Sequence, residues 1–232
     1  MRGDNSMMYS EPKKLLASYG RRRGRRLRAA KQELMDTLLP ELEIPAQGAL
    51  DLRALFPQKK SYWLEIGFGG GEHLMHQAAL HPEVGIIGCE PYINGVAGLL
   101  KYVRDHNIRN VRIHQHDARP LMARLPDACL DKVFILYPDP WPKARHHKRR
   151  LISTEFLTAL ARVMRAGAEL RLATDHEDYC TWMLEHLLPH PGFTWTAQSC
   201  ADWQTPWADW IPTRYEQKRL AGVPTYLGFR RK

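Results

Sequence analysis

The 232-residue sequence lacks the features of three broad classes of protein. No apolar run approaches the roughly 20 residues that a bilayer-spanning helix needs, and the basic N-terminus has no apolar stretch typical of a signal peptide. The four cysteines are at least 20 residues apart, so no C-x-x-C pair indicates a zinc or redox site, and we expect no bound metal. A composition of 44% apolar and 25% charged residues favours a packed globular domain over a disordered chain. We therefore expect a cytoplasmic protein.

Acidic residues are scarce in three segments, which hold most of the positive charge. The whole chain has 34 Lys+Arg against 25 Asp+Glu, a net charge of +9. Residues 1–32 contain ten basic and two acidic side chains, residues 141–150 five and none, and residues 214–232 six and one. The rest of the chain carries 13 basic and 22 acidic side chains, which gives −9. A single basic cluster is usually a solvated face, but three on an acidic body favour a polyanionic partner.

The first basic segment predicts an N-terminal arm. Residues 21–28 include six arginines and show no core-forming periodicity, so the segment repels itself in the absence of an anion. We expect residues 1–32 to form a mobile basic arm and residues 33–232 to form one domain.

Short apolar runs alternate with amphipathic stretches from residue 62 onward. The runs cover residues 62–67, 84–89, 111–116, 132–137 and 169–174, and the expected helices cover 71–80, 92–106, 119–125, 148–165 and 178–188. This alternation predicts a mostly parallel sheet with helices on both faces. Runs at 193–197 and 225–230 predict an antiparallel C-terminal edge, and residues 33–60 a short helix followed by a loop. The fold class is therefore α/β, with seven strands.

A glycine-rich loop follows the first predicted strand. It reads Leu64-Glu65-Ile66-Gly67-Phe68-Gly69-Gly70-Gly71-Glu72, which fits the pattern E-x-G-x-G-x-G. The dinucleotide pattern G-x-G-x-x-G would need glycine at position 72, so an NAD-dependent dehydrogenase is disfavoured. Glycines let the backbone approach a ligand closely, and Glu65 offers an acceptor to a cation. S-adenosylmethionine carries an ammonium and a sulfonium group but no pyrophosphate, so it suits this loop better than NAD.

Two further acids follow the next two predicted strands. Glu90 is placed to accept hydrogen bonds from ribose hydroxyls, and Asp117 to accept one from an adenine amino group. Taken alone, each is more simply a strand-end or capping residue. Together with Glu65, at successive strand ends, they predict a nucleoside pocket.

The fourth predicted strand leads into a stiff basic loop. Three prolines in residues 138–142 restrict the backbone around Asp139, which is expected beside the pocket. Trp141 either packs beneath the loop or offers a stacking face to a base. The side chains expected to contact phosphates follow it: Lys143, Arg145, Lys148, Arg149 and Arg150.

From about Ser18 to the C-terminus the sequence resembles the tRNA (guanine-N7)-methyltransferase family. The most specific part of the resemblance is Pro138-Asp139-Pro140-Trp141-Pro142-Lys143 through Arg150-Leu151. Supporting parts are the glycine loop, Ala173-Thr174-Asp175, Thr213-Arg214-Tyr215-Glu216 with Gly222, and Ser18-Tyr19-Gly20-Arg21-Arg22.

The resemblance implies a Rossmann-like class I methyltransferase that uses S-adenosylmethionine to methylate N7 of guanine 46 in the tRNA variable loop. It implies that the cofactor is bound by Glu65, Gly67, Gly69, Gly71, Glu90, Asp117 and Asp139, with Asp139 also the catalytic residue. It assigns substrate binding to Lys143, Asp175, Thr213, Arg214, Tyr215 and Glu216. It also implies that RNA is contacted by Arg145, His146, His147, Lys148, Arg149 and Arg150. The protein would be a monomer or a homodimer.

Two other functions stay open on the sequence alone. One is a class I methyltransferase that acts on a different nucleobase or on a small molecule. The other is a non-catalytic RNA-binding module with a Rossmann-like fold.

Overall fold

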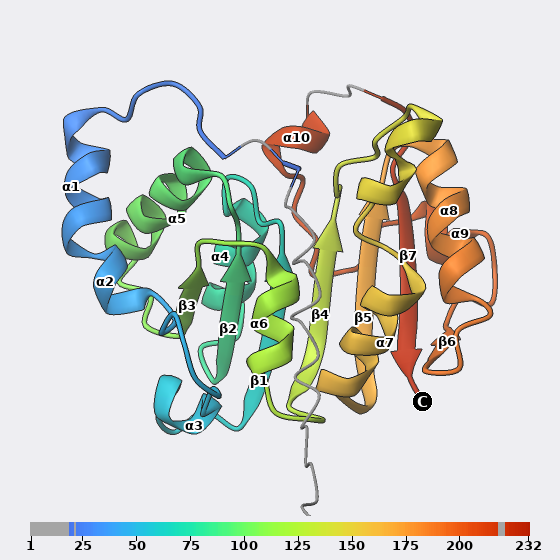
Figure 1. Cartoon of the computed structure of the whole chain (residues 1–232), viewed down its shortest axis with the longest axis horizontal. Helices are drawn as coiled ribbons and strands as arrows, with labels where there is room; N and C mark the ends of the chain where they lie inside the picture. Colours follow the sequence, from blue (N-terminus) through green and yellow to red (C-terminus); the bar gives the residue numbers. More distant parts are fainter. Residues whose placement is uncertain (1–18, 21, 218–220) are drawn as a thin grey trace, which may run out of the picture.

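The fold is built on one central sheet, and its parallel strands have their carboxyl ends on the same side. The computed structural model describes residues 19, 20, 22–217 and 221–232 (Figure 1). Most of the predicted arm (1–18 and Arg21), and residues 218–220 of the C-terminal basic segment, lie outside the described residues. The strands are β1 (Ser61–Ile66), β2 (Val84–Cys89), β3 (Val111–His114), β4 (Leu130–Leu136), β5 (Met164–Thr174), β6 (Phe193–Trp195) and β7 (Thr225–Arg231).

The sheet has the order β3-β2-β1-β4-β5-β7-β6. Strands β3, β2, β1, β4 and β5 pair in parallel, whereas β7 is antiparallel to both β5 and β6. This confirms the predicted mostly parallel, seven-stranded sheet with an antiparallel C-terminal edge. Strands β2 and β3 are added on one side of β1, and β4 and β5 on the other, so the strand order reverses between β1 and β4. An open α/β sheet binds ligands at such a point.

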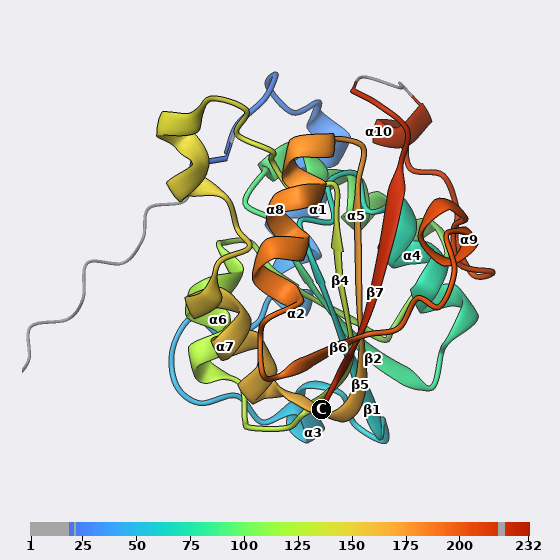
Figure 2. The same cartoon turned by 90° about the vertical axis from the view of Figure 1, so that its right-hand side faces the viewer.

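Helices cover both faces of the sheet (Figure 2). The helices are α1 (Ala29–Thr37), α2 (Leu39–Leu42), α3 (Leu52–Leu55), α4 (Glu72–Leu80), α5 (Ile93–Asp105), α6 (Ala118–Arg124), η1 (Ala144–Arg149), α7 (Thr154–Val163), α8 (Glu177–Leu187), α9 (Ala201–Gln204) and α10 (Arg214–Gln217). Neighbouring strand residues point to opposite faces. Ile86 and Phe134 therefore join the core under α1, α4 and α5, and Ile87 and Val133 join the core under α6, α7 and α8.

One predicted helix is wrong. Residues 148–165 do not form a single helix: η1 ends at Arg149, and α7 runs only from Thr154 to Val163. Ser153 caps α7, since its Oγ accepts a hydrogen bond from the N–H of Phe156 at 3.2 Å. Met164 already pairs with Leu130 of β4, so the chain enters β5 directly after α7.

Helix α1 begins at Ala29 and so continues across the predicted boundary at residue 32. The residues just before it contact α5: the N–H of Gly24 donates to Asn94 Oδ1 at 2.9 Å, and Asn94 Nδ2 donates to the Arg25 carbonyl at 2.7 Å. The described end of the arm therefore lies against the start of α5.

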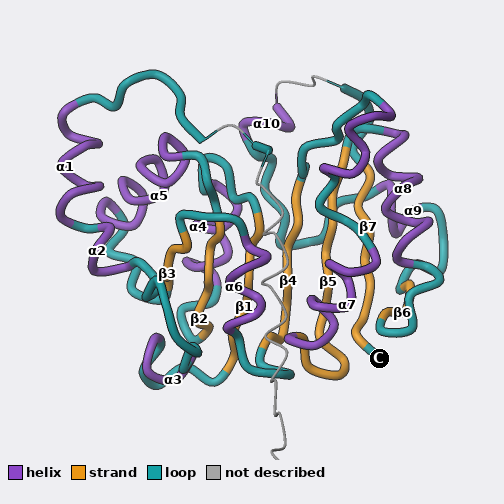
Figure 3. The backbone as a smooth tube through the Cα atoms, in the orientation of Figure 1, coloured by secondary structure: helices purple, strands orange, loops and turns teal. Residues whose placement is uncertain are grey.

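The loops that follow the parallel strands meet at the carboxyl edge of the sheet, where Figure 3 shows them in teal. Within the ranges that the structure describes, none of the helices combines the length and apolar character needed to cross a bilayer.

Candidate functional site

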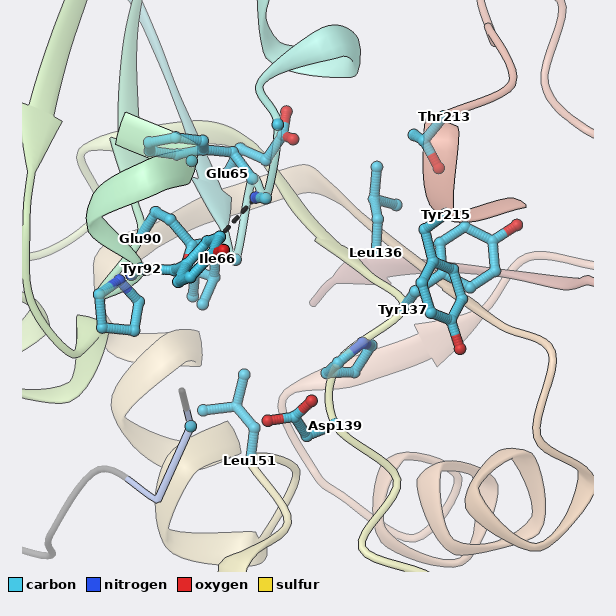
Figure 4. Close-up of a pocket in the computed structure, with 18 of the residues that line it drawn as sticks. Glu65, Ile66, Glu90, Tyr92, Leu136, Tyr137, Asp139, Leu151, Thr213 and Tyr215 are labelled. Atoms are coloured by element: carbon cyan, nitrogen blue, oxygen red, sulfur yellow. Dashed lines mark hydrogen bonds between the residues drawn. The ribbon is translucent and has the colours of Figure 1, made fainter. Parts of the chain in front are cut away.

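A cavity of about 910 Å³ opens at the carboxyl edge of β1, β2 and β4 (Figure 4). In this view Glu65 and Glu90 lie on one side, and Thr213 and Tyr215 on the other. The lining includes most of the residues predicted to bind cofactor or substrate: Glu65, Gly67, Gly69, Glu90, Asp117, Asp139, Thr213, Arg214 and Tyr215. Residues from widely separated segments of the chain thus meet in one place.

The glycine loop needs its glycines. Gly67, Gly69 and Gly71 have φ values of 78°, 53° and 84°, a region that side chains with a Cβ rarely adopt. Gly67 and Gly69 line the cavity, whereas Gly71 precedes α4 and packs against Leu99 instead. A Cβ on Gly95 of α5 would lie only 2.1 Å from the Gly69 carbonyl oxygen. The loop and α5 are therefore in direct backbone contact.

Glu90 supports this loop from the end of β2. Its two carboxylate oxygens accept hydrogen bonds from the N–H groups of Gly69 (2.7 Å) and Tyr92 (2.9 Å). Burial raises the pKa of Glu90, although these two hydrogen bonds oppose the shift. The carboxylate is thus held rigidly at the cavity wall.

Glu65 is joined to a buried histidine. Its Oε2 lies 2.7 Å from Nδ1 of His73 on α4, and both side chains are almost fully buried. The His73 ring packs against Trp210, with ring centroids 5.3 Å apart, and the Trp210 indole N–H donates to Glu216 at 3.1 Å. This chain of contacts connects the glycine loop to the 213–216 segment.

Asp117 caps the N-terminus of α6 and pairs with Arg119. Its carboxylate accepts from the Arg119 backbone N–H (2.9 Å) and forms an ion pair with the guanidinium (2.6 Å). Burial alone would raise the pKa of Asp117, but Arg119 outweighs this effect and lowers it. Asp117 therefore stays charged, with part of its hydrogen-bonding capacity already used.

The Asp139 loop holds an unusual backbone. The two aromatic residues that flank it, Tyr137 and Trp141, have φ values of 50° and 45°, which are costly for residues with bulky side chains. Such strain persists only where the surroundings enforce it, and here prolines occupy positions 138, 140 and 142. The Asp139 side chain is exposed at the cavity mouth, yet partial desolvation still raises the pKa of its carboxyl. Trp141 lines the cavity, so it does not simply pack beneath the loop.

The other predicted substrate-binding residues are placed less uniformly. Asp175 is buried and accepts a hydrogen bond from the Tyr215 hydroxyl at 3.3 Å, so it stands behind the wall that Tyr215 forms. Glu216 accepts from Trp210 and from the Tyr226 hydroxyl (2.8 Å), which anchors the segment rather than facing the cavity. Lys143 is exposed just before η1 and is not part of the lining.

The predicted RNA-contacting residues lie in three different settings. Arg145 and Lys148 are exposed, and His146 and His147 are half-buried. The Arg149 guanidinium lies 4.7 Å from the Tyr19 ring centroid and 5.0 Å from that of Trp141, and its side chain lines the cavity. Arg150 differs from all of them, because its side chain is only 1% exposed and is paired with Asp178. The structure thus holds Arg150 inside the protein, away from solvent.

Sequence reasoning missed several residues of the site. Tyr19 and Gly20 line the cavity, and a Cβ on Gly20 would lie 3.5 Å from Asp139 Oδ2. Their only signal was their place in the N-terminal motif. His73 had no signal, since a histidine eight positions after a strand-end acid is unremarkable before the fold is known. In the part of the chain that the structure describes, no group of three or more His, Cys, Asp or Glu side chains could hold a metal ion.

Comparison with known proteins gives a consistent result. A family model described as "Putative methyltransferase" matches residues 59–223. The chain is 51% identical over 224 residues to a tRNA (guanine-N(7)-)-methyltransferase of Ruegeria sp. (strain TM1040), covering 92% of this chain and 87% of that protein. It is 50% identical over 222 residues to a protein of the same name from Caulobacter vibrioides (strain NA1000 / CB15N), covering 95% of this chain and 97% of that protein.

Solved structures resemble it in fold. An rRNA methylase from Streptococcus thermophilus superposes with a TM-score of 0.52 at 11% identity, covering 78% of this chain and 91% of that one. A Streptococcus mutans protein in complex with SAH gives a TM-score of 0.51 at 11% identity, covering 75% of this chain and 90% of that one. These likenesses show the Rossmann-like fold of methyltransferases. Sequence identity near 50% over almost the whole length shows more, and the chain belongs to the tRNA (guanine-N7)-methyltransferase family.

Proposed function

We propose that this protein transfers a methyl group from S-adenosylmethionine to N7 of guanine 46 in the variable loop of tRNA. The observation that carries the proposal is the cavity in which Asp139 and the strand-end acids Glu65, Glu90 and Asp117 meet. The names of the relatives support the substrate and the reaction class.

The cavity residues fit this cofactor. Its ammonium and sulfonium groups are positive, and its ribose and adenine present hydrogen-bond donors, which match a wall of carboxylates at the ends of three strands. Glu90, fixed by two backbone N–H groups, would hold the ribose, and Asp117 the adenine amino group. Glu65 and the glycine loop would hold the amino acid end. When bound, S-adenosylmethionine supplies an electrophilic methyl group.

The chain's own task is chiefly orientation. Guanine N7 carries an in-plane lone pair and no proton, so the protein need not remove a proton before attack. Alignment of reacting groups can contribute about 7 to 11 kcal/mol to lowering a barrier. Asp139 would accept a hydrogen bond from guanine N1–H or the N2 amino group, which fixes the plane of the base. Asp175, buried behind Tyr215, would hold the Tyr215 ring in place through its hydrogen bond to the hydroxyl. A carboxylate there also offsets the positive charge that develops on the ring.

The exposed cations around the cavity would bind the tRNA backbone without reading its sequence. Lys143, Arg145 and Lys148 lie on or beside η1 and are exposed, the half-buried His146 and His147 lie between them, and the arm 1–32 would add further cations. We also propose that residues 33–232 form the methyltransferase domain. Because its proposed substrate is tRNA, we propose that the protein is located in the cytoplasm.

The test is methyl transfer from labelled S-adenosylmethionine to unmodified tRNA, followed by nucleoside analysis. The proposal predicts 7-methylguanosine as the labelled product. Label in a different nucleoside would indicate a methyltransferase of other specificity. Absence of both transfer and S-adenosylmethionine binding by calorimetry would support the non-catalytic RNA-binding alternative.

A further inference from the structure

A second cavity, of about 240 Å³, adjoins the first. Its walls come from α1, α5, α10 and the glycine loop, which Figure 1 shows near the carboxyl edge of the sheet. Gly70, Asn94 and Arg214 line both cavities, so they form a shared wall. Whatever occupies the second cavity is therefore a direct neighbour of the ligand in the first.

The lining of this second cavity carries three cations and no acid. Lys31 comes from α1, Lys101 from α5 and Arg214 from α10. Among the described residues Lys31 has no ion-pair partner, and Lys101 pairs only with Asp105, one turn along the same exposed helix face. Such exposed pairs contribute at most about 1 kcal/mol, so Lys101 can exchange Asp105 for another anion.

Arg214 is oriented by its neighbours. Its Nε lies 2.6 Å from Glu72 Oε1, and its Nη2 donates to the Tyr102 hydroxyl at 2.9 Å. Because that hydroxyl accepts from Arg214, its own proton is directed elsewhere and can serve a ligand in the cavity. Two lysines, a fixed arginine and a hydroxyl donor form a set typical of phosphate binding.

We propose that this second cavity binds a backbone phosphate of the tRNA, next to the nucleotide whose base enters the main cavity. The inference rests on the proposed function. A nucleotide in a chain carries phosphates on both sides, and a cationic cavity that shares a wall with the base-binding cavity suits one of them. The contact would fix the register of the RNA without reading sequence.

The experiment measures tRNA affinity against salt concentration for wild type and for the double variant Lys31→Ala/Lys101→Ala. Each neutralised phosphate contributes about 0.7 (single strand) to 0.9 (duplex) to the slope of log K against log[salt]. Removal of one phosphate interaction therefore lowers the slope by about 0.7 to 0.9, and the wild-type advantage in affinity shrinks about 2.6- to 3.5-fold between 50 and 200 mM salt. Lys31→Arg/Lys101→Arg, which keeps the charges, should keep the slope, and S-adenosylmethionine affinity should not change.

Lys60→Ala is the matched control, because Lys60 is an exposed lysine just before β1, at the opposite edge of the sheet. An unchanged slope in the double variant, or an equal change in Lys60→Ala, would overturn the inference. Inorganic phosphate is the second probe. Suppose that wild type binds phosphate, that the double variant does not, and that the two proteins show the same salt slope for tRNA. The cavity would then bind free phosphate, and the proposal would be wrong. If wild type transfers the methyl group but the double variant shows the wild-type salt slope, only this inference is wrong. If wild type transfers no methyl group, the proposed function is wrong.

Discussion

Arg150 offers a sharp test because its sequence context and its structural setting point to different roles. It ends a basic run expected to contact RNA, yet its side chain is buried. Its Nε donates to the Pro140 carbonyl at 2.8 Å, its guanidinium pairs with Asp178, and it lies 5.0 Å from the ring centroids of both Tyr179 and Trp182. Arg150 therefore ties the Asp139 loop to α8, and we predict that Arg150→Ala destabilises the fold.

The magnitude of this effect follows from the interactions that the substitution removes. A hydrogen bond to a charged group contributes roughly 1.5 to 3 kcal/mol, and a desolvated cation–π interaction about 1 to 2 kcal/mol. Since such contributions overlap, we expect the free energy of unfolding to fall by about 3 kcal/mol. For a chain of this size 1 kcal/mol corresponds to about 2 to 4 °C, so Tm should fall by about 6 to 12 °C.

The assay compares thermal unfolding of Arg150→Ala with that of Lys148→Ala. Lys148 is exposed on the same 3-10 helix, and surface substitutions of this kind usually change stability by no more than about 0.5 kcal/mol. The salt dependence of tRNA binding is measured for both. A near-normal Tm for Arg150→Ala, together with a reduced salt slope, would refute the structural role and restore Arg150 to the RNA-binding surface.

Three further predictions follow from the site. Gly95→Ala should weaken S-adenosylmethionine binding by at least about tenfold in calorimetry, equivalent to about 1.4 kcal/mol, because the new Cβ displaces the Gly69 carbonyl; equal affinity would contradict the close contact. Asp139→Asn should abolish turnover yet raise Tm at pH 7. The pKa of Asp139 is raised in the folded protein, so its ionisation lowers the free energy of unfolding above that pKa and has no effect below the unfolded value of 3.8. A lower Tm for Asp139→Asn at pH 7 would contradict this argument. Arg145→Ala/Lys148→Ala should reduce the salt slope of tRNA binding by about 1.4 to 1.8, and removal of residues 1–28 should reduce it further. An unchanged slope would indicate that these segments are solvated surface.

Much of the fold was readable from apolar runs. The six residues of β2 are all buried, so its run stands out, and the predicted boundaries 84–89 agree with the structure. Once the strands were predicted, the acids that follow them could be placed together, because parallel strands bring their carboxyl ends to the same side of the sheet. The family motif then distinguished Asp139 from the other acids.

Other features depend on contacts between distant residues, which no local pattern reports. The basic run 145–150 reads as a uniform charged surface, but Asp178 and the rings of α8 bury its last member. The pairing of Glu65 with His73 requires the turn at Gly71 and the packing of Trp210 from the far end of the chain. The wrong helix at 148–165 has a local cause instead: Ser153 caps α7, and this competed with a continuous helical pattern.

The measurement that tests the central proposal most directly is the position of the transferred methyl group. A tRNA transcript with guanine 46 and a matched transcript with adenine there are each incubated with the protein and labelled S-adenosylmethionine, and 7-methylguanosine is mapped by chemical cleavage. We predict one methyl group per molecule at guanine 46 in the first transcript and none in the second. Equal labelling of both transcripts would contradict the proposed target.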